Sequence, residues 1–224
     1  MKPTIQLIPV LELDPASFAQ ADHPMPTCGP AVDHPEPWDA WWRACLADSD
    51  IVQVSAIQPG TWWVPIRGLS GSPHLDAALD GLLNGDDAEP PADPEEELLA
   101  LPGGFVLCVG ERRLLPQCCV DLSNIHDWIE AAGRQSETWS MLWIGHPWTH
   151  TRSLGDQLVL LEPTEEKEPR EPQEWGRVPR QALRRAAENA LDELRDFADV
   201  LYPLMKARFP NHDGRKIAAL LVGL

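Results

Sequence analysis

Two adjacent cysteines, Cys118 and Cys119, have the side chains in this sequence that are best suited to chemistry. A thiolate is a nucleophile and a ligand for soft metal ions, and a nearby imidazole can act as its base or as a further ligand. His126 follows Cys119 by seven residues, and His146 lies between Gly145 and Pro147. These residue types allow either cysteine-dependent catalysis or a Cys/His metal site, provided that the fold brings them together.

The spacing of the cysteines argues against both kinds of site. Structural zinc sites usually take their thiolates from a Cys-x-x-Cys turn, and no such turn occurs here. Adjacent side chains in an extended backbone also point to opposite sides. Because free cysteine is among the most buried residue types, we expect Cys118 and Cys119 to be buried structural thiols. We therefore predict no catalytic residue, no metal and no cofactor, and the Cys/His metal site and the cysteine-dependent enzyme stay open as alternatives.

Tryptophan is the second unusual feature, with ten residues against one tyrosine and four phenylalanines. Tryptophan is enriched at the energetic centres of protein interfaces, although at least half of these rings are expected to fill the core. The pairs Trp41-Trp42 and Trp62-Trp63 cannot easily turn both rings inward, so one member of each pair is a candidate surface anchor. The candidate binding residues are Trp41, Trp42, Trp62, Trp63 and Trp148.

The formal net charge of −17 is concentrated in two proline-rich stretches. Residues 86–97 carry −7 and residues 162–174 carry −4. Such segments bury too little apolar surface to offset chain entropy, so we expect solvated connectors. The acidic balance disfavours nucleic acid as a partner and favours a basic protein, because a negative field attracts a positive surface.

Hydrophobic periodicity and turn residues predict the elements that position these side chains. The first region should contain a strand, a helix, two strands and a short helix, at residues 4–13, 37–47, 51–57, 61–66 and 75–83. The middle region should contain a hairpin, a helix and two strands, at residues 105–115, 123–133, 138–144 and 157–161. In this reading Pro116 ends the hairpin, the two thiols fill the corner, and Asp121 and Ser123 begin the helix that carries Trp128.

The C-terminal region is predicted to be helical over 179–209, with Pro203 kinking or dividing the helix near Tyr202. The apolar tail at 216–224 should dock on the preceding helix or on a second subunit, as in a homodimer. We therefore predict an α+β fold with a central, mostly antiparallel sheet, flanking helices and a helical C-terminal segment. Residues 1–162 would form the α+β domain with an acidic insertion at 86–97, residues 163–178 an acidic linker, and residues 179–224 the helical segment.

The N-terminus lacks the pattern of a secretory signal, and no apolar run is long enough to span a bilayer. Five scattered cysteines do not form the even pattern of a secreted disulfide framework. These features predict a cytoplasmic protein with reduced thiols and no membrane contact.

Two short segments carry a resemblance to a known group of proteins. The segment Leu115-Pro116-Gln117-Cys118-Cys119-Val120-Asp121-Leu122, then Trp128, and later Ile144-Gly145-His146-Pro147-Trp148 resemble the PxCCxDL…W and GHP pattern of uncharacterised bacterial proteins. Those proteins are similar to immunity or accessory proteins of contact-dependent and polymorphic toxin systems. The resemblance covers about residues 100–162, with Val120 where glycine is common, and it supplies no catalytic residue.

The resemblance implies a cytoplasmic, non-catalytic protein-binding module, an immunity protein that neutralises a basic bacterial toxin domain by direct binding. The missing catalytic signature, the acidic balance and the surplus of tryptophan agree with this prediction. The alternatives are the Cys/His metal-binding protein or cysteine-dependent enzyme that uses Cys118, Cys119, His126 and His146, and an oligomeric scaffold assembled through its C-terminal helices.

Overall fold

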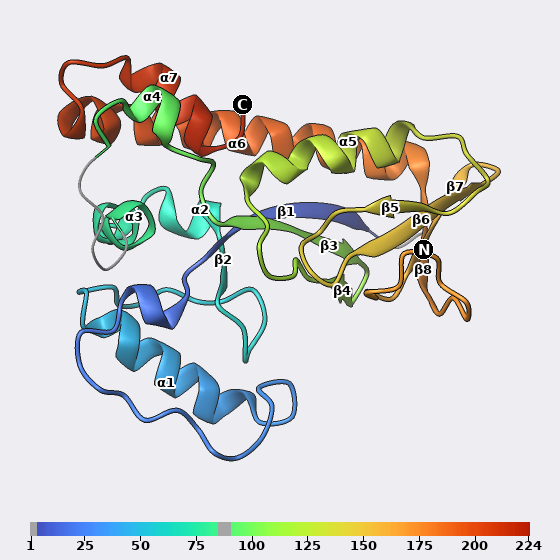
Figure 1. Cartoon of the computed structure of the whole chain (residues 1–224), viewed down its shortest axis with the longest axis horizontal. Helices are drawn as coiled ribbons and strands as arrows, with labels where there is room; N and C mark the ends of the chain where they lie inside the picture. Colours follow the sequence, from blue (N-terminus) through green and yellow to red (C-terminus); the bar gives the residue numbers. More distant parts are fainter. Residues whose placement is uncertain (1–3, 85–90) are drawn as a thin grey trace. The chain divides into compact units, whose positions relative to one another are not determined.

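The computed structural model describes residues 4–84 and 91–224 (Figure 1). These residues divide into two compact units. Of the described residues, unit 1 comprises 4–9, 102–196 and 223–224, and unit 2 comprises 10–84, 91–101 and 197–222. The strand β1 (Ile5–Glu12) and the helix α6 (Arg180–Arg208) each contribute one part to each unit. Each unit is therefore assembled from segments that lie far apart in the sequence.

Unit 1 contains an antiparallel sheet in the strand order β5-β6-β7-β8. The strands are β5 (Ser140–Leu142), β6 (Thr149–Leu154), β7 (Gln157–Leu161) and β8 (Glu174–Pro179). β6 and β7 pair around the turn Gly155-Asp156, where the positive φ of Gly155 suits a tight hairpin. The prediction for β7 is confirmed and that for β5 is too long, whereas β6 and β8 were not predicted.

A second hairpin in unit 1 joins β3 (Gly103–Val109) to β4 (Arg112–Leu114), with Leu107 opposite Leu114. The Gly110 amide at its turn donates to the carbonyl of Thr4, so the residue just before β1 lies beside the hairpin. This confirms the hairpin predicted at 105–115. Pro116 follows the strand as expected and is buried.

After the hairpin come the short 3-10 helix η2 (Leu122–Asn124) and the helix α5 (Ile125–Gly133). Asp121 caps η2, because its side chain accepts a hydrogen bond from the amide of Ser123 at 2.8 Å. Asp121 thus has the predicted role, and Ser123 lies inside the first turn rather than at the cap. Trp128 is fully buried, and its indole N–H donates to Asn124.

Unit 2 is mainly helical. It contains η1 (Pro15–Ser17), α1 (Pro35–Ala47), β2 (Trp63–Pro65), α2 (Ile66–Leu69), α3 (Leu75–Asn84), α4 (Pro94–Glu97) and α7 (Gly214–Leu221). The second half of β1 pairs antiparallel with β2, with Glu12 opposite Trp63. The strand predicted at 51–57 is wrong: the segment is irregular, and Gln53 has a φ of 62°, outside the range of a strand. The strand predicted at 61–66 shortens to β2.

The helix α6 continues unbroken through Pro203, so the predicted division near Tyr202 does not occur. Proline removes one backbone hydrogen bond from a helix. Pro203 lies on the exposed side, where water can solvate the released carbonyl, and the buried Leu201 and Met205 lie on either side of it in sequence. Burial of these side chains offsets the lost hydrogen bond, which the sequence pattern alone did not reveal.

The two antiparallel sheets and the helical C-terminal segment confirm the α+β class. Two sheets replace the single central sheet that we predicted.

The stretch predicted as the linker 163–178 contains most of β8 and a loop that returns to the sheet, where the Thr164 amide donates to the carbonyl of Trp148. Residues 86–90 of the predicted acidic insertion lie outside the described residues, and α4 occupies Pro94–Glu97. Within the described ranges, none of the helices has the length and apolarity needed to cross a bilayer.

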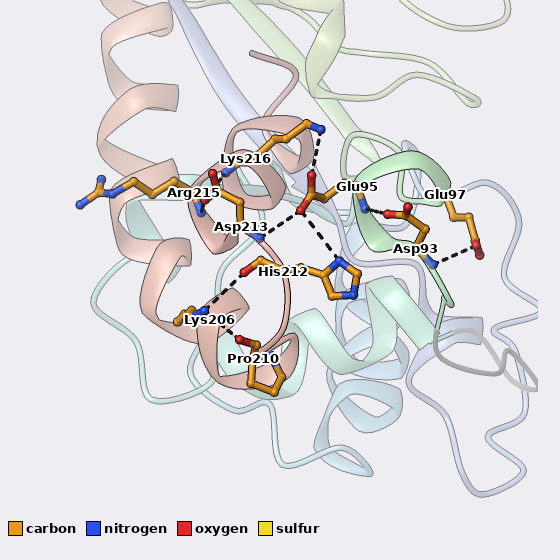
Figure 2. Close-up of polar contacts among 9 residues, drawn as sticks. All are labelled: Asp93, Glu95, Glu97, Lys206, Pro210, His212, Asp213, Arg215 and Lys216. Carbon is orange, nitrogen blue, oxygen red and sulfur yellow. Dashed lines mark hydrogen bonds and ion pairs between the residues drawn. The ribbon is translucent and has the colours of Figure 1, made fainter.

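A polar cluster holds the C-terminal helix α7 in unit 2 (Figure 2). Glu95 on α4 accepts a hydrogen bond from Lys216 at 2.8 Å and one from the amide of Asp213 at 3.0 Å. The His212 Nδ1 lies 3.8 Å from the same carboxylate. Asp213 in turn caps α7 by accepting from the amides of Arg215 and Lys216. The apolar tail predicted at 216–224 is therefore mostly a capped helix fastened to α4.

Glu95 makes the stability of unit 2 depend on pH. The hydrogen bond from Lys216, followed by the amide of Asp213, lowers the pKa of the Glu95 carboxyl. A carboxyl whose pKa is lowered in the folded state stabilises the fold above its ordinary pKa, and the contribution is lost as the pH falls through the lowered value. We expect Glu95→Gln to lower the Tm at neutral pH, and the difference from the wild type to vanish well below about pH 4, the ordinary range of a glutamate.

Thermal unfolding followed by circular dichroism between neutral and acidic pH measures this effect. Glu96→Gln is the matched control, because Glu96 is an exposed neighbour on α4 and the substitution removes the same charge. Equal losses of Tm for the two variants at neutral pH would contradict the assigned role of Glu95.

Candidate functional site

A hollow of about 570 Å³ in unit 2, which we call the tryptophan cleft, is the candidate functional site. Its walls include two rings of α1 and one from the segment before β2, together with residues of the loop that precedes α1. The residues that matter most are Asp22, His23, Met25, Trp38, Trp41 and Trp62. Pockets that bind ligands have volumes of about 300–1,000 Å³, so the cleft has the size of a binding site.

Helical periodicity decides which tryptophans reach the cleft. Trp38 and Trp41 are three residues apart on α1 and share one face, while Trp42 turns by about 100° into the core. The rings of Trp38 and Trp41 lie 5.6 Å apart at 89°. Those of Trp41 and Trp62 lie 6.4 Å apart at 68°. Trp41 therefore makes an edge-to-face contact with each of the other two rings.

Backbone carbonyls fix the orientation of these rings. The indole N–H of Trp38 donates to Gly29 at 2.9 Å, and that of Trp41 donates to His23 at 3.0 Å. Both acceptors lie in the loop before α1, so the same bonds hold the loop against the helix. Because the N–H groups are used internally, the rings offer a ligand their faces and not a donor.

Asp48, just after α1, anchors the same loop. Its carboxylate accepts hydrogen bonds from the amides of Gln20 and Ala21 and from His23 Nε2, each at 2.8 Å. The Ala21 amide, then the Gln20 amide and the His23 side chain, lower the pKa of the Asp48 carboxyl. His23 is thus engaged in positioning the loop.

Carboxylates surround the cleft. Between Glu12 and Asp50 the sequence has eight acidic residues and one basic residue, Arg43, and Asp14 and Asp22 line the cleft itself. Burial, and then the charge of Asp14, raise the pKa of the Glu12 carboxyl, and a hydrogen bond with Trp62 opposes the rise. Outside the two acidic stretches, the negative charge of the chain is thus concentrated in the segment that builds the cleft.

The lining of the cleft suits binding better than catalysis. Its thiol, Cys45, is buried, and burial followed by the charge of Asp48 raises the pKa of this thiol. A raised pKa keeps the sulfur protonated and poorly nucleophilic. His23 is hydrogen bonded through Nε2 to Asp48, so this imidazole nitrogen is already engaged in holding the loop.

Three of the five tryptophans selected from the sequence belong to other surroundings. Trp42 and Trp63 are only 1% and 7% exposed, so these two belong to the core, and their selection as surface contacts is corrected. Trp148 lies in unit 1, where its ring stacks on Trp143 at 6.4 Å. Trp41 and Trp62 remain at the cleft, one member from each adjacent pair. In all, four of the ten rings are buried and six are partly exposed, fewer buried than expected.

The structure also corrects the prediction for the double cysteine. Cys118 and Cys119 are exposed, and the corner between β4 and η2 contains the buried Pro116 and Val120 instead. Cys119 has a φ of 64°, and this left-handed turn directs the chain toward η2. The two thiols therefore lie at the surface and do not fill the corner.

The two motif segments of unit 1 pair with each other. The Gln117 amide donates to Ile144, and the His146 amide donates to Cys118 at 2.9 Å. Gly145 has a φ of 101°, and a Cβ there would collide with the backbone of Gln117 and Cys118. The glycine of Gly145-His146-Pro147 is thus needed for this close backbone approach, which gives both motifs a structural role.

Only part of the predicted Cys/His constellation comes together. The Cys118 thiol donates to the backbone carbonyl of His146 at 3.1 Å, and His146 Nδ1 lies 3.9 Å from Glu165. His126 bonds instead to the carbonyl of Gly223. In the part of the chain that the structure describes, no group of three or more His, Cys, Asp or Glu side chains is arranged to hold a metal ion.

Comparison of the chain with protein-family models, with curated proteins and with solved structures gives no match.

The division between core and cleft predicts different costs for two adjacent substitutions. Trp42→Ala should lower the free energy of unfolding by about 3–5 kcal/mol, because it empties a fully buried site and leaves the Leu13 carbonyl without its indole donor. Trp41→Ala, next to it on the same helix, should cost clearly less. Urea unfolding followed by circular dichroism measures both, and equal losses would contradict this division.

The exposure of the cysteines predicts their reactivity. Cys28, Cys118 and Cys119 should react quickly with Ellman's reagent in the folded protein, whereas the buried Cys45 and Cys108 should react only after denaturation. Cys118→Ser and Cys119→Ser should each remove one fast-reacting thiol. Protection of either thiol in the native protein would show that the corner is closed.

Proposed function

We propose that this chain is a non-catalytic protein-binding module that holds a basic protein partner through the tryptophan cleft. The observation that carries the proposal is the cleft itself, in which Trp38, Trp41 and Trp62 present fixed ring faces beside exposed carboxylates. Rigid tryptophan rings give large contact area at low cost in side-chain entropy, which is why they dominate interface hot spots.

The charge around the cleft indicates the sign of the partner. Asp14 and Asp22 line the cleft and are exposed, and further carboxylates lie in the flanking segments. A surface of this sign accelerates association with a positive surface and opposes binding to another acidic one. We therefore propose a basic protein domain as the partner.

The resemblance of the segments around Cys118 and His146 to immunity proteins suggests which basic protein this is. We propose that the partner is the toxin domain of a bacterial polymorphic toxin and that binding neutralises it in the cytoplasm. Because the two motif segments pair with each other in unit 1, their role in this proposal is to build the fold, and the tryptophan cleft of unit 2 supplies the contact.

The test uses purified proteins encoded by the genes that flank the gene for this chain. Titration calorimetry should show that one of them, a basic domain, binds with a Kd below about 1 μM. Co-expression of the chain should restore growth to cells that express that domain. If no flanking product binds, or if binding leaves its toxicity unchanged, the immunity function is refuted.

A pair of variants locates the contact. Trp38→Ala should weaken binding by roughly 30-fold or more, as expected for a hot-spot residue that contributes at least 2 kcal/mol. Trp139→Ala is the control, because Trp139 is partly exposed outside the cleft in unit 1. Equal affinity of the two variants would show that the partner binds elsewhere.

A further inference from the structure

We infer that the tryptophan cleft recognises the ammonium group of a lysine side chain on the partner protein. This inference rests on the proposed function, since it names the chemical group that the binding module would take. It follows from the arrangement of the rings, from the groups that hold the rings in place and from the charges at the edge of the cleft.

The ring geometry fits a compact cation. A cation within about 6 Å of an aromatic face is attracted to the negative face of the ring, most strongly with tryptophan. Trp41 lies at 89° to Trp38 and at 68° to Trp62, so the rings that line the cleft stand at steep angles to one another, as in a corner, and do not form one flat wall. An ammonium group is nearly spherical and contacts more than one wall of such a corner, whereas a planar guanidinium stacks on a single face.

Two cation–π contacts elsewhere in the chain show how a guanidinium lies on a tryptophan ring. Arg112 lies over the ring of Trp175, and Arg152 over the ring of Trp139, at 4.9 and 4.5 Å from the ring centroids. Each of these contacts uses one ring and one guanidinium. The tryptophan cleft combines three rings, and in the described part of the chain neither lysine nor arginine is among its lining residues.

The hydrogen bonds of the indole groups exclude an anion. The N–H groups of Trp38 and Trp41 are donated to backbone carbonyls, and Trp62 is hydrogen bonded to Glu12. An anionic ligand would need such donors. A cation needs acceptors, which Asp14 and Asp22 provide at the exposed edge.

The remaining lining suits the aliphatic part of lysine. Met25 is 60% exposed beside the rings, and its flexible thioether can pack on methylene groups. A volume of about 570 Å³ also leaves room for the backbone next to the lysine. The site would therefore read a lysine within a peptide segment, with the ammonium in the corner.

Three acetylated and amidated pentapeptides test the inference, each with two glycines on either side of lysine, norleucine or arginine. Norleucine keeps an unbranched aliphatic chain of similar length and lacks the charge. NMR titration of the indole N–H resonances of Trp38, Trp41 and Trp62 reports binding at the cleft. We expect the lysine peptide to bind at least tenfold more tightly than the norleucine peptide and more tightly than the arginine peptide. Equal binding of lysine and norleucine, or no binding of lysine, would overturn the inference.

Two double variants test the role of the carboxylates. Asp14→Asn with Asp22→Asn should weaken binding of the lysine peptide at least fivefold and leave the norleucine peptide unchanged. Asparagine can still cap η1, where Asp14 accepts from the Ala16 amide, so the fold should be retained. Asp33→Asn with Asp50→Asn is the control, because both aspartates are exposed and do not line the cleft. The two substitutions remove the same charge as the pair at the cleft.

The same variants distinguish this inference from the proposed function. In one outcome a flanking gene product binds and Trp38→Ala weakens that binding, but Asp14→Asn with Asp22→Asn changes the affinity for neither this protein nor the lysine peptide. The lysine inference then fails and the binding function stands. If the lysine peptide binds as expected and no flanking product does, the proposed function fails and the lysine site stands.

Discussion

The placement of adjacent tryptophans on opposite faces of α1 is the constraint on which the candidate site depends. Trp42 is buried and donates its indole N–H to the carbonyl of Leu13, which ties α1 to the segment that follows β1. Because the next side chain along a helix points about 100° away, fixing Trp42 in the core also fixes where Trp41 points. The buried position of Trp42 thus determines that the ring of Trp41 points toward the cleft.

Hydrogen bonds to α1 and to Asp48 also order the loop before α1. It has no regular secondary structure, yet its carbonyls accept from Trp38 and Trp41, and its start donates amides to Asp48. These hydrogen bonds satisfy backbone groups of the loop, and their partners are aromatic residues of the site and Asp48. The rings and the loop therefore hold each other in place, and a ligand would meet a preorganised surface, which reduces the entropy lost on binding.

Local pattern predicted much of the fold and little of the site. Three elements were predicted correctly: the β3-β4 hairpin from its turn residues, β7 from its apolar run, and α6 from its helical periodicity. In each case the signal lies within the residues of the element itself. The strands β6 and β8 were missed, since both pair with β7 and β8 begins at the end of the acidic, proline-rich stretch that we predicted as part of a linker. The exposed position of Cys118 and Cys119 was also missed, because burial propensity is an average that the left-handed turn at Cys119 overrides.

The sequence by itself determined the α+β class, the role of Asp121 as a cap and the rule that each adjacent tryptophan pair can bury only one ring easily. Only the tertiary structure decided which ring that is, since the answer depends on the phase of α1 and on the pairing of β1 with β2. It also added Met25 and Asp22 to the candidate site, from a loop whose approach to α1 no local pattern encodes. The physical reason is that periodicity is a property of neighbouring residues, whereas a cleft is made by residues that meet only after folding.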